Sequence, residues 1–449
     1  MDWRKIAILH MLIVTTGHVQ SQEVSLKTDD TFLVGWWCQS NHLPERCRMQ
    51  STIPPFAIPL PADVPCAISI HALAAQLTQL VDQRSPRGVR YPLAPLLTIA
   101  ILAKLAGYSR VEALADWARL RADALVRLFG LDRPTMPHAR TWGRILAHAV
   151  DPTALATLLG QVFHPPHQPG VVAARGSVVL AVDGKTLRGT IPLGHTQGVH
   201  LVAVYLPEQG VTLAQIAVDR KTNEITVVPT LLTQVDLTGM VVTGDAMQCQ
   251  QALSRQIVDA GGDYLWTVTD NQPTLLADIQ QVFAPSTALP GWSDPAPDWQ
   301  TARTVEAGHG RIEERVITVS SMLADYTPWP GLAQVFRLER TVSDGLGRQR
   351  REVAYGVTSL PASSAPPARL LAIARTHWGI ENGLHYRRDV SLQEDASLLR
   401  RGQGPQVLAA LNNAVIGLMR QHGEHNLPAL QRRFAYHWDR AVPGLRREY

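Results

Sequence analysis

The chain has 449 residues, of which 45% are apolar and 18% are charged, so it is long enough for two or more domains and too apolar to be largely disordered. Its formal net charge of +4 is compatible with a polyanionic partner without demonstrating one. Its four cysteines show neither CxxC nor CxxH spacing, which argues against a structural zinc site or a disulfide framework and fits a reducing compartment.

Residues 1–65 are expected to form an irregular N-terminal extension. Arg4 and Lys5 precede a short apolar run, Ile6 to Val14, which resembles the beginning of a secretory signal, although no small-residue cleavage site follows it. The run is too short to span a bilayer. The other interpretation is that the start is assigned too far upstream and that the working protein begins near Met49.

Residues 66–165 have the pattern of an all-helical domain. We expect helices over Ile68–Val81 and Leu93–Ala106, a third after Ser109, and others from Thr141 and Asp151 onward. Arginines recur through this region, and they suit either phosphate contacts in a DNA-binding domain or the solvated basic face of a helical bundle. The arginines are Arg84, Arg87, Arg90, Arg110, Arg119, Arg121, Arg140 and Arg144.

From Gly176 the apolar pattern changes to that of strands. Strand, strand, strand, helix, strand, helix, strand is the predicted order, which is the element order of the ribonuclease H-like fold. The sequence therefore predicts an α/β protein whose core comprises residues 176–270 and 366–449. The expected elements are strands over Val178–Asp183, Val199–Leu206 and Val211–Val218, a helix over Glu224–Leu232, a strand over Met240–Thr243, a helix over Gln250–Ala260 and a strand over Tyr264–Val268.

Residues 271–365 interrupt this core and have the pattern of a β-rich insertion. Three β-like runs are expected there, over Arg311–Val319, Gln334–Val342 and Glu352–Thr358. A linker rich in proline, serine and alanine follows the last run. It leads the chain back into the core through a helix that is expected to begin near Ala368.

That helix carries an acidic residue in an unusual position. Leu370, Ala374, Trp378 and Glu381 are predicted to lie along one face, so that a carboxylate continues an apolar stripe. A buried carboxylate is costly unless it is paired or bound to a metal. Glu381 is therefore a candidate metal ligand.

Two further acids follow predicted strands. Asp183 comes at the end of the first strand of the core and Asp245 at the end of the fourth, so their carboxylates are expected to lie side by side if these strands are neighbours. Each acid alone is weak evidence, because a strand-end aspartate usually serves a turn and Glu381 could pair with His385 or Arg388. Together, the three acids predict a site for Mg²⁺ or Mn²⁺, which prefer hard oxygen ligands.

Several motifs resemble those of one protein family. The chain is similar to bacterial insertion-sequence transposases of the DDE type, in particular the branch that includes the H-repeat-associated proteins found with Rhs elements. The resemblance covers about residues 70–440, and the motifs occur in the family's order. They are AVDGKTLRG (181–189), VVTGDAMQCQ (241–250), GGDYLWTV (261–268), NQPTL (271–275), GHGRIEER (308–315) and HWGIENGLH (377–385), together with a helical leader over residues 87–118.

The resemblance implies a function and partners. It implies a ribonuclease H-like core in which Asp183, Asp245 and Glu381 hold two Mg²⁺ or Mn²⁺ ions. The expected reactions are cleavage of the ends of an insertion sequence and strand transfer into target DNA, carried out in the cytoplasm, at the nucleoid. The expected partners are terminal inverted repeats, target DNA and a second copy of the chain in a synaptic dimer. Two alternatives stay open: a stand-alone nuclease, and a catalytically inactive or domesticated DNA-binding remnant.

Residues around the triad are candidates for DNA contacts. Most are basic or aromatic side chains near one of the three acids, and for the histidines a role next to the metal ligands is an alternative. The candidates are Lys185, Arg188, Lys221, Asn271, His377, His385, Arg387 and Arg388.

Overall fold

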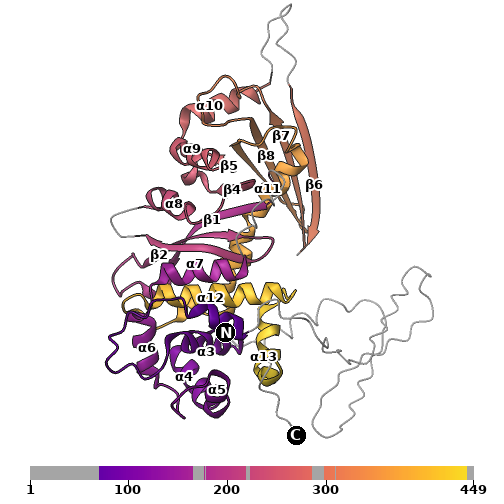
Figure 1. Ribbon diagram of the computed structural model, residues 1–449. Coiled ribbons are helices and arrows are strands. Elements are labelled where there is room, and N and C mark those ends of the chain that lie inside the picture. The colour runs from indigo at the N-terminus through magenta and orange to yellow at the C-terminus, as the bar shows by residue number, and fades with distance from the viewer. Residues whose placement is uncertain are drawn as a thin grey trace, which may run out of the picture. The chain divides into compact units, whose positions relative to one another are not determined.

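The computed structural model describes residues 70–164, 176, 178–218, 223–285, 298–308 and 310–441 (Figure 1). They belong to one compact unit, Val64–Tyr449. The predicted N-terminal extension and the candidate DNA contact Lys221 lie outside the described residues.

The helices before the sheet are short and amphipathic, except for one that is apolar all round. In α3 nearly every side chain is buried, including that of Lys104. The start of α7 is fixed by Asp151, whose carboxylate accepts a hydrogen bond from the Ala154 backbone at 2.8 Å. The helices are α2 (Ile70–Leu77), α3 (Leu93–Leu105), α4 (Val111–Arg119), α5 (Ala122–Phe129), α6 (Ala139–His148) and α7 (Pro152–Phe163).

A nine-stranded mixed sheet in the order β3-β2-β1-β4-β5-β9-β8-β7-β6 forms the centre of the described structure. Strands β1, β4 and β5 run parallel, and the other neighbouring pairs are antiparallel. The predicted order of strands and helices from β1 to β5 is confirmed. These elements are β1 (Val178–Leu187), β2 (Val199–Leu206), β3 (Val211–Val218), α8 (Glu224–Leu232), β4 (Met240–Gly244), α9 (Gln251–Asp259) and β5 (Asp263–Val268).

The predicted end of the first strand at Asp183 is wrong. β1 continues through Gly184 to Leu187, because its antiparallel pairing with β2 extends to Val199. Its parallel pairing with β4 stops earlier, at Val182 opposite Gly244. Asp183 is therefore inside a strand, but at the point where that strand loses one of its two neighbours.

The insertion adds strands to the same sheet. After α10 (Pro273–Val282) the chain forms four strands where three β-like runs were expected, and the last of them pairs with β5, with Leu265 opposite Thr358. Arginines and glutamates alternate across these strands; Arg340, for example, contacts both Glu313 and Glu352. The strands are β6 (Gln300–Gly308), β7 (Arg311–Ser320), β8 (Gln334–Asp344) and β9 (Gln349–Thr358).

After the insertion, α11 (Pro367–His377) gives way to two π-helical turns, Glu381–His385 and Arg387–Ser391. We call residues 381–391 the π-helical segment. The predicted single face through Glu381 is wrong: Leu370 is buried, but Trp378 is 67% exposed and the Glu381 side chain is 55% exposed. α11 ends at His377, before Trp378, and π-helical turns begin at Glu381, so the α-helical spacing behind the prediction does not continue to Glu381.

The C-terminal helix α12 (Gly404–Gln421) is buried along most of its length. It packs on α3, α6, α7 and β3, so the helices before β1 and the sheet share one hydrophobic core (Figure 1). A last helix, α13 (Leu427–Ala441), packs against α3 and α12.

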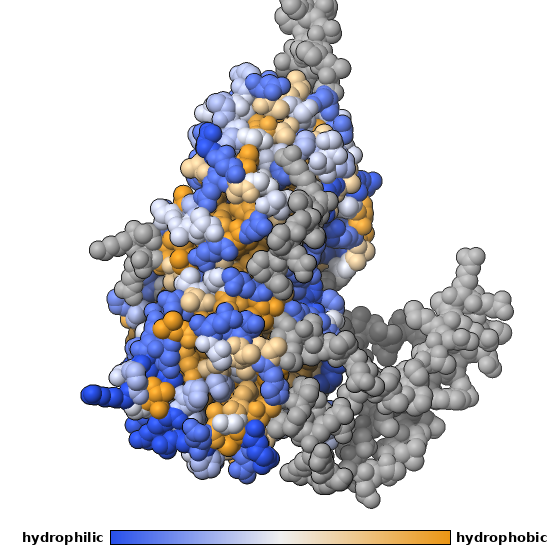
Figure 2. Space-filling view, viewed as in Figure 1, coloured by the Kyte–Doolittle hydropathy of each residue, from blue (hydrophilic) through white to orange (hydrophobic). Residues whose placement is uncertain are grey.

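On the face of the molecule seen in Figure 2, apolar residues gather in small patches separated by polar ones. Among the described helices, no single one is long and apolar enough to cross a membrane. Only α6 and α7 taken together pass that test of length and composition, and they meet at an angle of 89°.

Candidate metal centre

Asp183 and Asp245 follow the last paired residues of two neighbouring parallel strands. Val182 of β1 is opposite Gly244 of β4, and each aspartate is the next residue in its chain. The expected adjacency of these two strands is therefore confirmed. A strand end of this kind presents side chains outside the sheet, where α/β proteins commonly bind ligands.

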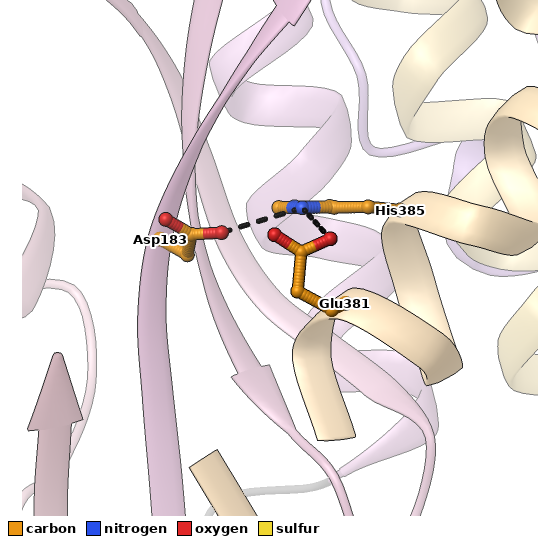
Figure 3. Close-up of side chains that lie close together, drawn as sticks. All are labelled: Asp183, Glu381 and His385. Atoms are coloured by element: carbon orange, nitrogen blue, oxygen red, sulfur yellow. Dashed lines mark ion pairs between the residues drawn. The ribbon is translucent and has the colours of Figure 1, made fainter. Parts of the chain in front are cut away.

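On its other side, Asp183 faces the π-helical segment (Figure 3). Nδ1 of His385 lies 3.3 Å from Oδ2 of Asp183 and 3.7 Å from Oε2 of Glu381. One ligand atom from each of these three residues lies within 4.8 Å of the other two, and within the described part of the chain no other such group of three is found. Asp245 is outside this group. The structure thus brings Asp183 and Glu381 together with His385, and leaves Asp245 beside them.

The electrostatics of the site are those of crowded acids. Burial, with smaller contributions from the nearby charges of Asp245, Glu381 and Glu224, raises the pKa of Asp183 to about 7, against one backbone hydrogen bond that lowers it. Burial also raises the pKa of Asp245, again with a contribution from Glu224. A divalent cation would relieve this mutual repulsion.

The three-residue group fits such a cation. An ion with bonds of about 2.1 Å holds neighbouring ligand atoms about 3 Å apart, and the two separations from Nδ1 of His385 are 3.3 and 3.7 Å. The same nitrogen belongs to a side chain that is only 7% exposed, whereas the Asp183 side chain is 18% exposed. The site is thus closed on the histidine side and open toward Glu381.

Lys185 is two residues after Asp183 and lies on the same face of β1. Its Nζ is 2.5 Å from Oδ2 of Asp389, which is four residues after His385 in the π-helical segment. Two consecutive side chains on one face of β1 therefore contact two side chains one turn apart. Because Lys185 is 8% exposed and paired, it is not free to bind a DNA phosphate here, contrary to the prediction.

Arg388 is also not available to DNA, and the prediction that it grips DNA is corrected. It is fully buried and contacts Glu394, with both Nε and Nη2 at 2.8 Å from Oε2. These two residues belong to a buried polar network, in which hydrogen bonds of 2.8 to 3.2 Å connect α3, β3, the π-helical segment and α12. The network comprises Lys104, Gln215, Arg388, Glu394, Asn412 and Asn413.

On the opposite face of β1, Glu224 occupies the space beside Gly184. A Cβ atom at Gly184 would lie 2.1 Å from Oε1 of Glu224. The carboxylate also contacts Nε2 of His200 at 2.7 Å and accepts a hydrogen bond from Gln248 at 3.2 Å. The glycine next to Asp183 therefore leaves room for a half-buried acid that packs against the strand there.

The family models decide the affiliation. Residues 174–417 match the transposase DDE domain, and residues 74–162 match the segment described as DDE_Tnp_1-associated. The chain belongs to the transposase DDE domain family. The matched range contains Asp183, Asp245, Glu381 and His385 of the candidate metal centre.

Named relatives agree with this membership. The chain is 28% identical over 363 residues to a putative transposase, YncI, of Escherichia coli O157:H7, covering 79% of this chain and 88% of that one. It is 27% identical over 358 residues to the H repeat-associated putative transposase YhhI of Escherichia coli K12, covering 78% and 91%. A solved piggyBac transposase synaptic complex with hairpin DNA aligns at 12% identity and a TM-score of 0.38 over 86% of this chain and 78% of that one, too distant to bear on the fold.

The other candidate DNA contacts of this transposase-family chain differ in exposure. Arg188 and Asn271 are exposed, and Asn271 donates a hydrogen bond at 2.7 Å to the backbone carbonyl of Ala246, next to Asp245. Arg387 is partly buried and donates to the backbone carbonyl of His425 at 3.1 Å. Both side chains thus lie on the surface, and Asn271 lies next to the segment that carries Asp245.

His377 and His385 have side chains directed inward. Nδ1 of His377 is 3.2 Å from Oγ1 of Thr243, and burial lowers its pKa to about 4. Burial lowers the pKa of His385 to about 3, with the charges of Arg388 and Lys185 adding to the effect. Both imidazoles are therefore neutral near pH 7. The close approach of His385 to the acids was signalled in the sequence only by its position four residues after Glu381, and the alternative role next to the metal ligands describes its place better than a DNA contact does.

Proposed function

We propose that this protein is a transposase that cuts the ends of an insertion sequence and joins the freed 3′-hydroxyl to target DNA. The observation that carries the proposal is the convergence of Asp183 and Glu381, which come from distant parts of the chain, beside Asp245 on the neighbouring strand. Membership of the transposase DDE domain family supports the same conclusion.

The proposed fold of the core is ribonuclease H-like. Its support is the strand order β3-β2-β1-β4-β5, with an antiparallel β1-β2-β3 meander and with β4 and β5 parallel to β1. The proposed domain organisation has this core at residues 176–270 and 366–449, the β-rich insertion at 271–365 and the helical domain at 66–165. We also propose that the protein acts in the cytoplasm.

We propose that Asp183, Asp245 and Glu381 hold two Mg²⁺ or Mn²⁺ ions, with Asp183 between the other two acids. Ions bound there would supply charge stabilisation to the attacking and leaving oxygens at phosphorus. The charges of both Asp245 and Glu381 raise the pKa of Asp183, which supports Asp183 as the ligand common to both ions. Glu381, the most exposed member of the three-residue group, is the acid on the side from which the DNA backbone would approach.

The chemistry requires no covalent enzyme intermediate. In hydrolysis a water oxygen bonds to phosphorus while the bond from phosphorus to the 3′-oxygen breaks, and that oxygen takes up a proton. In strand transfer the oxygen of the resulting 3′-hydroxyl loses its proton and bonds to a target phosphorus. The bond from that phosphorus to a 3′-oxygen of the target strand breaks, and that leaving oxygen takes up a proton. Because two element ends must be processed together, a homodimer bound to two inverted repeats is the proposed assembly.

The test is cleavage of DNA that carries the inverted repeats flanking the gene, with Mg²⁺ or Mn²⁺. Asp183→Asn should lower the cleavage rate at least about 100-fold and leave DNA binding intact, because the variant loses one metal ligand. Asp259→Asn, at the exposed end of α9, is the matched control and should cut normally. Efficient cutting by the Asp183 variant would sink the metal-site assignment.

A further inference from the structure

The geometry points to a nitrogen ligand in this metal site. We propose that Nδ1 of His385 binds the ion directly, together with one carboxylate oxygen each from Asp183 and Glu381. The inference rests on the proposed function, because it concerns the metal of the same site. It replaces the expectation that His385 contacts DNA with a defined role in metal binding.

The distances are the first argument. Nδ1 is 3.3 Å from one carboxylate oxygen and 3.7 Å from the other. Neither distance is that of a well-formed hydrogen bond, for which about 2.7 to 3.2 Å is typical. They exceed by about 0.3 and 0.7 Å the spacing between ligands of one ion, which is about 3 Å for bonds of about 2.1 Å.

The direction and burial of the imidazole are the second argument. His385 is 5% exposed, and its ring is directed at the two carboxylates (Figure 3). Its other nitrogen, Nε2, is buried without a hydrogen-bond partner among the described residues. No hydrogen bond at Nε2 therefore fixes the ring, and its closest polar contacts are those of Nδ1 with the two carboxylates, which a cation bound between them would hold together.

The local charges are the third argument. Two cationic side chains near these ligands in sequence are already paired, Lys185 with Asp389 and Arg388 with Glu394. Neither ion pair includes Asp183 or Glu381. Among the described residues, the ion pairs of Asp183 and Glu381 are with His385 and not with a lysine or arginine, so a bound ion would neutralise their charge.

The backbone geometry is the fourth. The amide of Tyr386 donates to the carbonyl of Glu381, an i to i+5 bond that makes the turn π-helical. A second such bond joins Leu392 to Arg387. Single π-turns inside helices often occur at functional sites, and here one spans the two proposed ligands, from the first to the last residue of the turn.

A nitrogen ligand has a measurable consequence for metal preference. Imidazole binds transition ions better than Mg²⁺, which prefers oxygen and retains its waters. The full-length protein should therefore bind Mn²⁺ and Co²⁺ more tightly than Mg²⁺, by at least about 10-fold. His385→Asn should reduce this preference because it removes the imidazole.

The test is pulsed electron paramagnetic resonance of the full chain loaded with Mn²⁺ alone. A ¹⁴N coupling to the bound Mn²⁺ should be present in the unsubstituted protein, lost in His385→Asn, and retained in His195→Asn, the same change at an exposed histidine. His385→Asp, which offers an oxygen near the position of Nδ1, should keep Mn²⁺ bound but lose the coupling. This second variant separates loss of the ligand from loss of the fold.

Three results would overturn the inference: Mn²⁺ binding that depends on Asp183 without nitrogen coupling, coupling that persists in His385→Asn, or no Mn²⁺ binding that depends on Asp183. The first leaves the proposed function standing if DNA cleavage still requires the acids. Nitrogen coupling together with no DNA cleavage under any metal would instead support the site and refute the function.

Discussion

Arg388→Met is predicted to destabilise the fold rather than weaken DNA binding. The substitution keeps an unbranched side chain of similar length but removes a guanidinium whose pairing with Glu394 is fully buried, with side-chain exposures of 0% and 2%. Breaking a buried ion pair by removing one partner costs about 3–5 kcal/mol, because the other charge is left uncompensated.

The structure places the expected cost at the lower end of that range. Glu394 keeps a hydrogen bond from Asn412 at 2.8 Å, and the ammonium of Lys104, itself bonded to Asn412 at 2.8 Å, is close enough to interact with its charge. We therefore expect the free energy of unfolding to fall by about 3 kcal/mol. The double variant Arg388→Met with Glu394→Gln should lose less than the sum of the two single changes, by about 1–3 kcal/mol.

The assay is urea unfolding followed by tryptophan fluorescence, with DNA affinity measured in parallel. Arg119→Met is the control, because Arg119 forms an exposed pair with Asp116 whose side chains are 65% and 66% exposed, and it should change stability by less than about 0.5 kcal/mol. Unchanged stability of Arg388→Met together with a clear loss of DNA affinity would refute the reasoning and restore the predicted DNA contact.

Two more predictions concern the strand that carries Asp183. The pKa of Asp183 is raised from 3.8 to about 7 in the folded state, so the metal-free folded protein holds a proton that the unfolded chain releases. The free energy of unfolding should therefore fall as the pH rises from about 4 to 7, by on the order of 2–4 kcal/mol. Asp183→Asn should flatten this part of a thermal-unfolding pH profile. An unchanged profile in that variant would contradict the assigned burial. Gly184→Ala should cost about 1–3 kcal/mol in urea unfolding, because the new Cβ would push the Glu224 carboxylate away from its contacts with His200 and Gln248. Gly143→Ala in α6, where the Cβ meets nothing within 4 Å, should be neutral or stabilising, and equal effects of the two changes would argue against the packing described.

Much of the core could be predicted from the sequence, because its strands and helices have clear apolar periods and short connections. The bounds of β2, β3 and α8 agree residue for residue with the expectation. The prediction was wrong at Gly184, where glycine reads locally as a break. The glycine instead makes room for the carboxylate of Glu224, which reaches the strand from a helix on the other face. That contact leaves no signal in the local sequence.

The segment around Glu381 was harder to predict. A π-turn has no propensity signature of its own, so the sequence does not show that α-helical spacing ends before Glu381. That spacing predicted Trp378 on the apolar face, and Trp378 is in fact exposed. The burial of Arg388 depends on Glu394 and on residues of α12, and an arginine following an acid in sequence gives no indication of which partner it will take. Sequence reasoning identified the acids, while the packing that surrounds them depends on contacts between distant residues.

The proposed activity is tested most directly by strand transfer. A labelled DNA end with a free 3′-hydroxyl at the tip of the inverted repeat is incubated with the protein, Mn²⁺ and a supercoiled plasmid. We expect joined products with the unsubstituted chain and none with Asp245→Asn. Asp245 lies beside the three-residue group, and the proposed two-ion site requires it as a metal ligand. Joined products from Asp245→Asn at the rate of the unsubstituted chain would contradict this proposal.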